Sequence, residues 1–402
     1  MDSRMNMQQI KRRKVFYIPG FDPFPARRYR ELYRSNSQDQ AAISDYTISQ
    51  SALHLKDGFG WQVHARFGDQ SSEAEIEVLV WSDLVKDTMR AGILATYLQL
   101  LRTAWIYVST GALADVIKLR KGPVVAALYP VGFLLGQGMI ALAIAFIFGS
   151  ILANIQPYLF WLGAVLIWPV LEIFRRLDGR IFAYYLMQDY AFTAQFGGAY
   201  PPELNHRLKQ FGQKVSQALA QDWDEVLVVG HFSGVHLAVS ILAELGRRGE
   251  IGRASMPVGF LSLGHVVPMV TFSPNAAELR RDLQDLSCMG DVFWVDVSAP
   301  GDGCSFALCD PVAVSGLVLA DKTGPLVISA AFTQTLSPER WKSLRWRFFR
   351  LHFQYLCAFD RPREYDYFQI TAGPVSLSHR FQDRKASKSR IETAFARHRD
   401  MA

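Results

Sequence analysis

The stretch that decides the fold is VLVVGHFSGVHLA, at residues 226–238. Its first four residues form the continuous apolar run that is typical of a strand buried on both faces of a parallel sheet. Gly230 ends that run at once, and from Val235 to Leu245 the pattern is helical, with Gly246 behind it as a stop signal. A buried strand, a tight turn and a helix in direct succession predict a strand–turn–helix unit of an α/β protein.

Short apolar runs elsewhere in the chain repeat this pattern. We expect further strands at 15–18, 62–67, 75–81, 258–263, 292–297 and 326–331, and a helix over 204–219 whose apolar residues recur at helical spacing. Strands that alternate with helical stretches predict a mostly parallel sheet covered by helices. The expected fold class is therefore α/β.

The longest apolar segment runs from Gly122 to Leu171 and contains no Asp, Glu, Lys, Arg or His. About 20 apolar residues are enough for a helix to cross the hydrocarbon core of a bilayer. The segment divides into 131–152 and 158–174, joined by a turn-forming stretch that ends at Pro157. It predicts an inserted transmembrane helical hairpin, although a hairpin that re-enters from one side is left open.

Basic residues flank the hairpin on both sides. They are Lys118, Arg120 and Lys121 before it, and Arg175, Arg176 and Arg180 after it. Because Lys and Arg gather on the cytoplasmic side of membrane helices, both ends of the hairpin are expected in the cytoplasm. We therefore expect a multi-pass integral membrane protein, in a bacterial inner membrane, with the bulk of the chain cytoplasmic.

The segment from Ala91 to Ile117 is also apolar, and its only charged residues are Arg102 and Asp115. Two interpretations remain open, a helix that lies in the headgroup region and a helix that packs on the soluble domain.

These features divide the chain into four parts. Residues 1–121 hold the N-terminal part of the α/β domain and the interfacial helix, 122–176 the hairpin, 177–382 the C-terminal part of the domain, and 383–402 a basic tail. The tail is expected to fray or to rest against anionic lipid.

Composition narrows the class of function. Of 402 residues, 50% are hydrophobic and 20% charged, which excludes a disordered chain, and the net charge of +6 fits an anionic membrane surface. No basic stripe is interleaved with aromatic residues, so we expect no nucleic-acid partner. The four cysteines lack metal-ligand or disulfide spacing, and a G-x-G-x-x-G motif is absent after the strand at 226–229, so we expect no metal and no cofactor.

The turn Gly230-His231-Phe232-Ser233-Gly234 resembles the nucleophile elbow of the α/β-hydrolase superfamily, in particular membrane-anchored serine hydrolases of the lipase type. In that elbow a sharp turn lifts the nucleophile above the sheet, and small residues stand two positions to either side of it. Gly230 and Gly234 match those two positions, but Phe232 occupies the place of the serine. The resemblance leaves two interpretations, a degenerate elbow without a nucleophile and a shifted turn that presents Ser233.

The resemblance also implies the remaining parts of a site. Residues 18–23 resemble the loop that supplies an oxyanion-hole amide, here the N–H of Phe21 acting together with that of Ser233. Asp302 is in the position of the family's acid and His352 in that of its proton-accepting histidine. Asp296 is the weaker choice for the acid and His379 the reserve for the histidine, while His231 and His236 are given no catalytic role.

The function expected from the resemblance is hydrolysis of a membrane lipid or acyl ester at the membrane surface, by a chain that is itself membrane-anchored. The alternative is an inactive pseudo-hydrolase that acts as a lipid-binding or scaffold protein, because Phe232 has no group that can attack an acyl carbon. A transporter is the third class, but Gln137 and Asn154 are nearly the only polar residues available to line a path.

Overall fold

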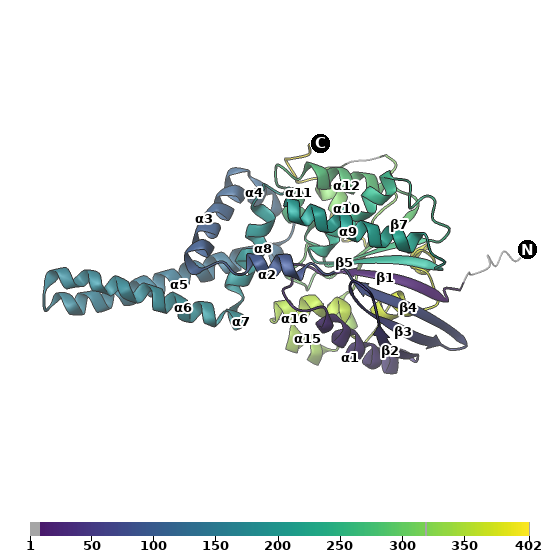
Figure 1. Cartoon of the computed structure of the whole chain (residues 1–402), viewed down its shortest axis with the longest axis horizontal. Coiled ribbons are helices and arrows are strands. Elements are labelled where there is room, and N and C mark those ends of the chain that lie inside the picture. Colours follow the sequence, from purple (N-terminus) through teal and green to yellow (C-terminus); the bar gives the residue numbers. More distant parts are fainter. Residues whose placement is uncertain (1–8, 318–319, 402) are drawn as a thin grey trace, which may run out of the picture.

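Strand β5 (Glu225–His231) lies inside an eight-stranded sheet (Figure 1). The structure is a computed structural model, and it describes residues 9–317 and 320–401. The strand order is β2-β3-β4-β1-β5-β6-β7-β8. Strands β4, β1, β5, β6, β7 and β8 pair in parallel, and β2, β3 and β4 form an antiparallel edge. Their bounds are β1 Arg12–Ile18, β2 Thr47–Leu53, β3 Phe59–Phe67, β4 Gln70–Val78, β6 Val258–Leu263, β7 Val292–Ser298 and β8 Leu326–Ser329. The prediction of an α/β fold with a mostly parallel sheet is confirmed.

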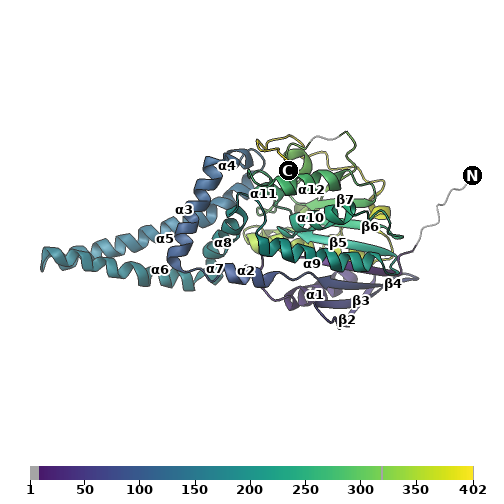
Figure 2. The same cartoon turned by 45° about the horizontal axis from the view of Figure 1, so that its top comes forward.

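Helices cover both faces of the sheet (Figures 1 and 2). On one face α9 (Pro202–Leu219), α10 (Gly234–Arg247) and α12 (Ala277–Ser287) pack against strand residues such as Phe16 and Val228. On the other face α1 (Arg27–Ser44) and the C-terminal helices pack against Tyr17 and Val229. Neighbouring strand residues thus face opposite layers, which is why the central strands are apolar throughout.

The remaining elements are short and connect these layers. They are α2 Ser82–Thr88, α4 Ala112–Val116, α7 Asp178–Ile181, α11 Val267–Thr271, α13 Pro311–Val314, α14 Phe332–Thr335, α15 Pro338–Leu344, α16 Phe348–His352, the 3₁₀ turn η2 Phe353–Leu356, α17 Tyr367–Ala372 and α18 Leu377–Phe381.

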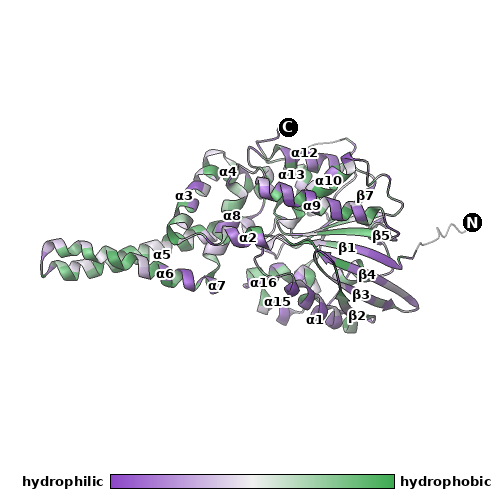
Figure 3. Ribbon diagram, in the orientation of Figure 1, coloured by the Kyte–Doolittle hydropathy of each residue, from purple (hydrophilic) through white to green (hydrophobic). Residues whose placement is uncertain are grey.

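The apolar segment forms the predicted inserted hairpin, which projects from the body of the molecule (Figure 1). Helix α5 (Lys121–Ala153) runs outward, and the returning arm is a 3₁₀ helix, η1 (Pro157–Leu166), followed by α6 (Ile167–Arg176). Both arms are long and apolar enough to cross a membrane by length and composition, and the ribbon coloured by hydropathy in Figure 3 marks their residues as mostly hydrophobic. A Cβ on Gly163 would lie 2.1 Å from the carbonyl oxygen of Ala145, so the absence of a side chain allows the two arms to touch.

Helix α3 (Ile93–Ser109) packs one face on α8 (Ala183–Ala194) at the base of the hairpin. Of the two interpretations of this segment, packing on the rest of the chain is therefore observed. The opposite face of α3 carries exposed apolar side chains, so this packing leaves contact with lipid open.

The C-terminal tail packs against the body of the molecule, whereas the sequence-based expectation was that it frays or rests against anionic lipid. The amide of Ile391 donates to the carbonyl of Leu308, and Ala396 is buried against the body. Arg397 donates to the carboxylate of Asp115 from Nε at 2.7 Å and Nη2 at 3.1 Å. These contacts hold the tail along α4 and α13, because backbone groups of the tail are hydrogen-bonded there and the buried Asp115 carboxylate is paired with the half-exposed Arg397.

Candidate functional site

The turn between β5 and α10 has the geometry of a sharp elbow. Phe232 has a φ of +57°, a conformation that a bulky residue rarely adopts. A Cβ on Gly230 would lie 2.7 Å from Cα of Val235, and one on Gly234 would lie 2.1 Å from the carbonyl oxygen of Ile18. The turn therefore requires glycine on both sides of Phe232, as the sequence predicted.

The side chain of Phe232 fills the position at the apex of this turn. Its ring meets the ring of His352 edge to face, with centroids 4.8 Å apart and an interplanar angle of 75°. Its Cβ lies close to Gly20, where an added Cβ would come within 2.9 Å. A phenyl ring, which has neither a nucleophilic atom nor a proton to give up, thus stands in front of the histidine.

His352 and Asp302 are brought together as the sequence predicted. Nδ1 of His352 lies 2.8 Å from Oδ2 of Asp302, which also accepts a hydrogen bond from the Tyr355 hydroxyl at 3.1 Å. Oδ1 of Asp302 accepts from the amide of Cys304 at 2.9 Å. Burial by itself would raise the pKa of Asp302, but the His352 ring and these hydrogen bonds outweigh it and hold that pKa below its usual value. Asp302 is therefore an anion that orients the imidazole.

Nε2 of His352 is buried and has no hydrogen-bond partner among the residues that the structure describes. It is the ring nitrogen that does not face Asp302, and a histidine held in this way can accept a proton there. The arrangement is a histidine–aspartate dyad, and among the described residues no hydroxyl group bonds to its Nε2.

His231 packs against the histidine of the dyad. Its ring stacks on that of His352 with centroids 4.6 Å apart and an angle of 18°, and Nε2 donates to the backbone carbonyl of His352 at 3.3 Å. Burial, and then the nearby His352 ring, lower the pKa of His231 to about 3. His231 is therefore a neutral positioning residue, a role that the sequence analysis did not assign.

The Ser233 hydroxyl forms no hydrogen bond with the dyad, since Nε2 of His352 has no partner among the described residues. Its Oγ accepts a hydrogen bond from the backbone amide of Phe21 at 2.8 Å, and the side chain is buried. The amide expected to stabilise an oxyanion is thus close to the elbow, as predicted, but the Ser233 hydroxyl occupies it. Of the two interpretations of the elbow, the geometry favours the degenerate one.

Ser233 also lines two small cavities on the α8 side of the elbow. Each holds about 20 Å³, which is room for a water molecule, and Asp189, Thr193 and His236 line both. Pro123, at the base of the membrane hairpin, lines the first. Neither cavity has the volume of an acyl chain.

Two ionisable side chains in these walls have strongly shifted pKa values. Burial raises the pKa of Asp189 to about 8 and lowers that of His236 to about 3. Nδ1 of His236 is 2.8 Å from the hydroxyl of Tyr200. Both side chains are therefore largely neutral at pH 7. Asp189 was not among the predicted site residues, because its only signal in the sequence is a carboxylate in an apolar helix that follows the hairpin.

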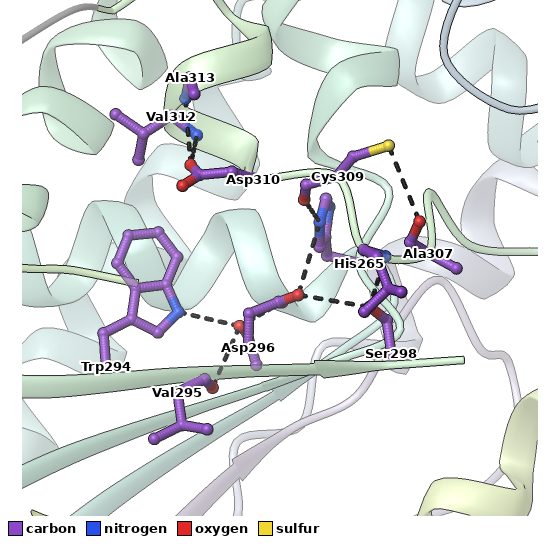
Figure 4. Close-up of polar contacts among 12 residues, drawn as sticks. His265, Trp294, Val295, Asp296, Ser298, Ala307, Cys309, Asp310, Val312 and Ala313 are labelled. Atoms are coloured by element: carbon purple, nitrogen blue, oxygen red, sulfur yellow. Dashed lines mark hydrogen bonds and ion pairs between the residues drawn. The ribbon is translucent and has the colours of Figure 1, made fainter. Parts of the chain in front are cut away.

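Asp296, the weaker choice for the acid, belongs to a separate buried group (Figure 4). Its Oδ1 accepts from the Ser262 hydroxyl at 2.6 Å, and its Oδ2 is 3.9 Å from Nε2 of His265, which donates to the carbonyl of Cys309 at 2.8 Å. Burial is the main reason that the pKa of Asp296 is raised. This group braces the end of β7. The reserve histidine, His379, lies in α18, and it is His352 that pairs with Asp302.

Among the described residues no group of three or more His, Cys, Asp and Glu side chains could hold a metal ion. No family model matches the chain, and neither a curated protein nor a solved structure was found to match it.

Proposed function

We propose that the protein is a membrane-anchored pseudo-hydrolase of the α/β-hydrolase type, which acts as a scaffold at the membrane surface and does not turn over an ester. The observation that carries the proposal is the ring of Phe232 at the apex of the elbow, 4.8 Å from the ring of the histidine that would otherwise activate a nucleophile. Covalent acyl transfer requires a nucleophilic side chain at that point, and a phenyl ring is not one.

Ser233 supports the same proposal, because it is the only hydroxyl side chain within the elbow. Its Oγ accepts a hydrogen bond from the Phe21 amide and none of the dyad's nitrogens is bonded to it. A shift that brought Ser233 to His352 would have to break this hydrogen bond and displace the Phe232 ring.

Anchoring is supported by the two apolar arms of the hairpin and by the basic residues at its base. Arg120 donates from Nε to the carbonyl of Ala307 at 2.9 Å, and Tyr190 donates to the carbonyl of Ala126 at 3.1 Å. The hairpin is thus attached to the loop that follows Asp302 and to the wall of the elbow cavities. We propose that this attachment holds the elbow side of the domain next to an anionic membrane surface on the cytoplasmic side.

A hydrolase of membrane lipid or acyl esters is the second candidate, and one observation favours it. The dyad of His352 and Asp302 is complete, with Nε2 unpartnered among the described residues. A dyad of this kind serves proton transfer when a nucleophile lies beside it.

Labelling with a fluorophosphonate probe in solubilised membranes separates the two candidates. We expect no labelling of the native chain or of Ser233→Ala, and labelling of Phe232→Ser that disappears when His352→Ala is added. Phe232→Ala is the matched control, since it opens the same space without adding a hydroxyl. Labelling of the native chain that is lost in Ser233→Ala would overturn the proposal and establish Ser233 as the nucleophile of a hydrolase.

A further inference from the structure

Helix α3 carries an apolar stripe that no other described part of the chain covers. Its members are between 57% and 72% exposed and follow one another at steps of four and three residues, which places them on one face of a helix. They are Leu94, Leu98, Leu101, Trp105 and Val108. We call this set the α3 stripe.

The opposite face of α3 is fixed to the molecule. Thr96, Leu100 and Tyr107 are buried, and α3 packs on α8 through this face. The Tyr107 hydroxyl donates to the carbonyl of Met269 at 3.1 Å, and the Gln188 side chain donates to the Thr96 hydroxyl at 3.2 Å. Because these contacts fix the rotation of the helix, the α3 stripe must face away from the domain.

The position of α3 relates the stripe to the hairpin. The helix begins at the base of the hairpin and leads away from the direction of its arms in both views (Figures 1 and 2). Tyr97 donates to the carbonyl of Leu134 in α5 at 2.8 Å, and Ile93 packs with Ala141 and Leu171 of the two arms. The stripe therefore continues the apolar surface of the hairpin at its base.

Charge also favours a membrane as the occupant of this face. Residues 91–114 contain no Asp or Glu, and Arg102, which is exposed on α3, is their only charged residue. Arg176, at the base of the returning arm, is exposed as well. An apolar face with basic residues beside it, and with a Trp in the stripe, is typical of a helix that lies in the headgroup region.

We propose that α3 is a third membrane element, which lies in the plane of the bilayer surface with the α3 stripe in the acyl chains and Arg102 among anionic headgroups. This inference rests on the proposed anchoring by the hairpin. It adds that the bilayer covers the α3 stripe and thereby fixes the orientation of the domain, since a hairpin alone leaves the domain free to tilt.

Spin labels at single cysteines test this placement in the full-length protein, reconstituted in vesicles of phosphatidylcholine and phosphatidylglycerol. The variants are Leu98→Cys and Trp105→Cys in the stripe, Phe146→Cys in the hairpin, and Gln217→Cys on the exposed face of α9 as the aqueous control, each with the native cysteines replaced. Power saturation compares collisions of the label with oxygen, which concentrates in lipid, and with a water-soluble nickel chelate.

We expect labels at 98 and 105 to collide with oxygen at least fivefold more, relative to nickel, than the label at 217, with the label at 146 higher still. Labels at 98 and 105 that match 217, while 146 is in lipid, would overturn the inference and leave the hairpin anchor intact. A water-exposed label at 146 would overturn the anchor and the inference together. Spin–spin broadening at 98 between protein copies, without exposure to oxygen, would show that a second copy covers the stripe and would likewise overturn the inference.

Discussion

The backbone amide of Phe21 donates a hydrogen bond to Oγ of Ser233 at 2.8 Å. In an active elbow, that amide has to be free to receive the negative charge that develops on a substrate oxygen. Here Ser233, the residue after Phe232, places its own hydroxyl oxygen on that amide. The apex of the elbow thus carries a phenyl ring, and one of the two amides expected as oxyanion donors is occupied by the Ser233 hydroxyl.

This contact makes a prediction about a restored elbow. In the Phe232→Ser background, Ser233→Ala should increase the rate of fluorophosphonate labelling at least about tenfold, because one oxyanion donor contributes about 10²–10³ in rate. The rate would be measured from time courses of probe incorporation. An equal or lower rate in the double variant would mean that the Phe21 amide does not face the reacting centre.

The positive φ of Phe232 makes a prediction about stability. Phe232→Gly should be more stable than Phe232→Ala by about 1 kcal/mol, because both remove the ring but only glycine adopts a φ of +57° without strain. Denaturant unfolding in detergent would measure the difference. Inside a helix alanine is more favourable than glycine, so Ala238→Gly in α10 serves as the control. This variant should have a lower free energy of unfolding than the native chain. A Phe232→Ala variant as stable as Phe232→Gly would contradict a strained turn.

The raised pKa of Asp189 predicts a dependence of stability on pH. Its pKa of about 8 exceeds the value of about 3.9 in an unfolded chain, so between these values the folded state binds more protons and the free energy of unfolding falls as pH rises. Asp189→Asn cannot ionise. The free energy of unfolding of Asp189→Asn minus that of the native chain should therefore increase between pH 5 and pH 8. We expect an increase of more than about 1.4 kcal/mol, which corresponds to one pKa unit.

Urea unfolding in detergent at a series of pH values would test this expectation. Asp39→Asn, at an exposed position of α1, is the control for the same substitution at a carboxylate that is not buried. A difference between Asp189→Asn and the native chain that does not change with pH would mean that Asp189 is ionised in the folded protein.

The close contact inside the hairpin predicts the effect of adding volume there. Gly163→Val should lower stability by about 1–3 kcal/mol, because its Cβ would lie 2.1 Å from the carbonyl oxygen of Ala145 and force the arms apart. Gly132→Val is the matched control, since a Cβ at Gly132 meets no atom within 4 Å. Thermal unfolding in detergent would measure both variants, and equal midpoints would rule out tight packing of the arms.

Much of the fold could be predicted because buried strands and helices have recognisable apolar patterns in the sequence. The strand at 258–263 was predicted with its observed bounds, since each of its residues is buried and the run is apolar. Strand β2 was missed because Thr47–Leu53 forms the edge of the sheet, where its residues are half-buried or exposed and leave no apolar run. The 3₁₀ conformation of η1 was also missed, since hydropathy does not distinguish it from an α-helix.

The candidate site could likewise be predicted only in part. Asp302 and His352 were found because the resemblance fixes their order along the chain, and the structure brings them to 2.8 Å. The orientation of Ser233 could not be predicted, because it depends on the Phe21 loop, more than two hundred residues away in the sequence. Asp189 depends likewise on how α8 packs against the elbow, which no local pattern encodes.

The length of the hairpin beyond α3 has a consequence for the membrane itself. Ile93 at the start of α3 packs with Ala141, and from there the outgoing arm rises only about 18 Å to its end at Ala153. With α3 at the bilayer surface, this reach is shorter than the hydrocarbon core of about 30 Å. The arms and α3 then take up more area in the near leaflet than in the far one. A one-sided wedge of this kind favours membrane that bulges toward the protein, so the protein should collect on small, highly curved vesicles.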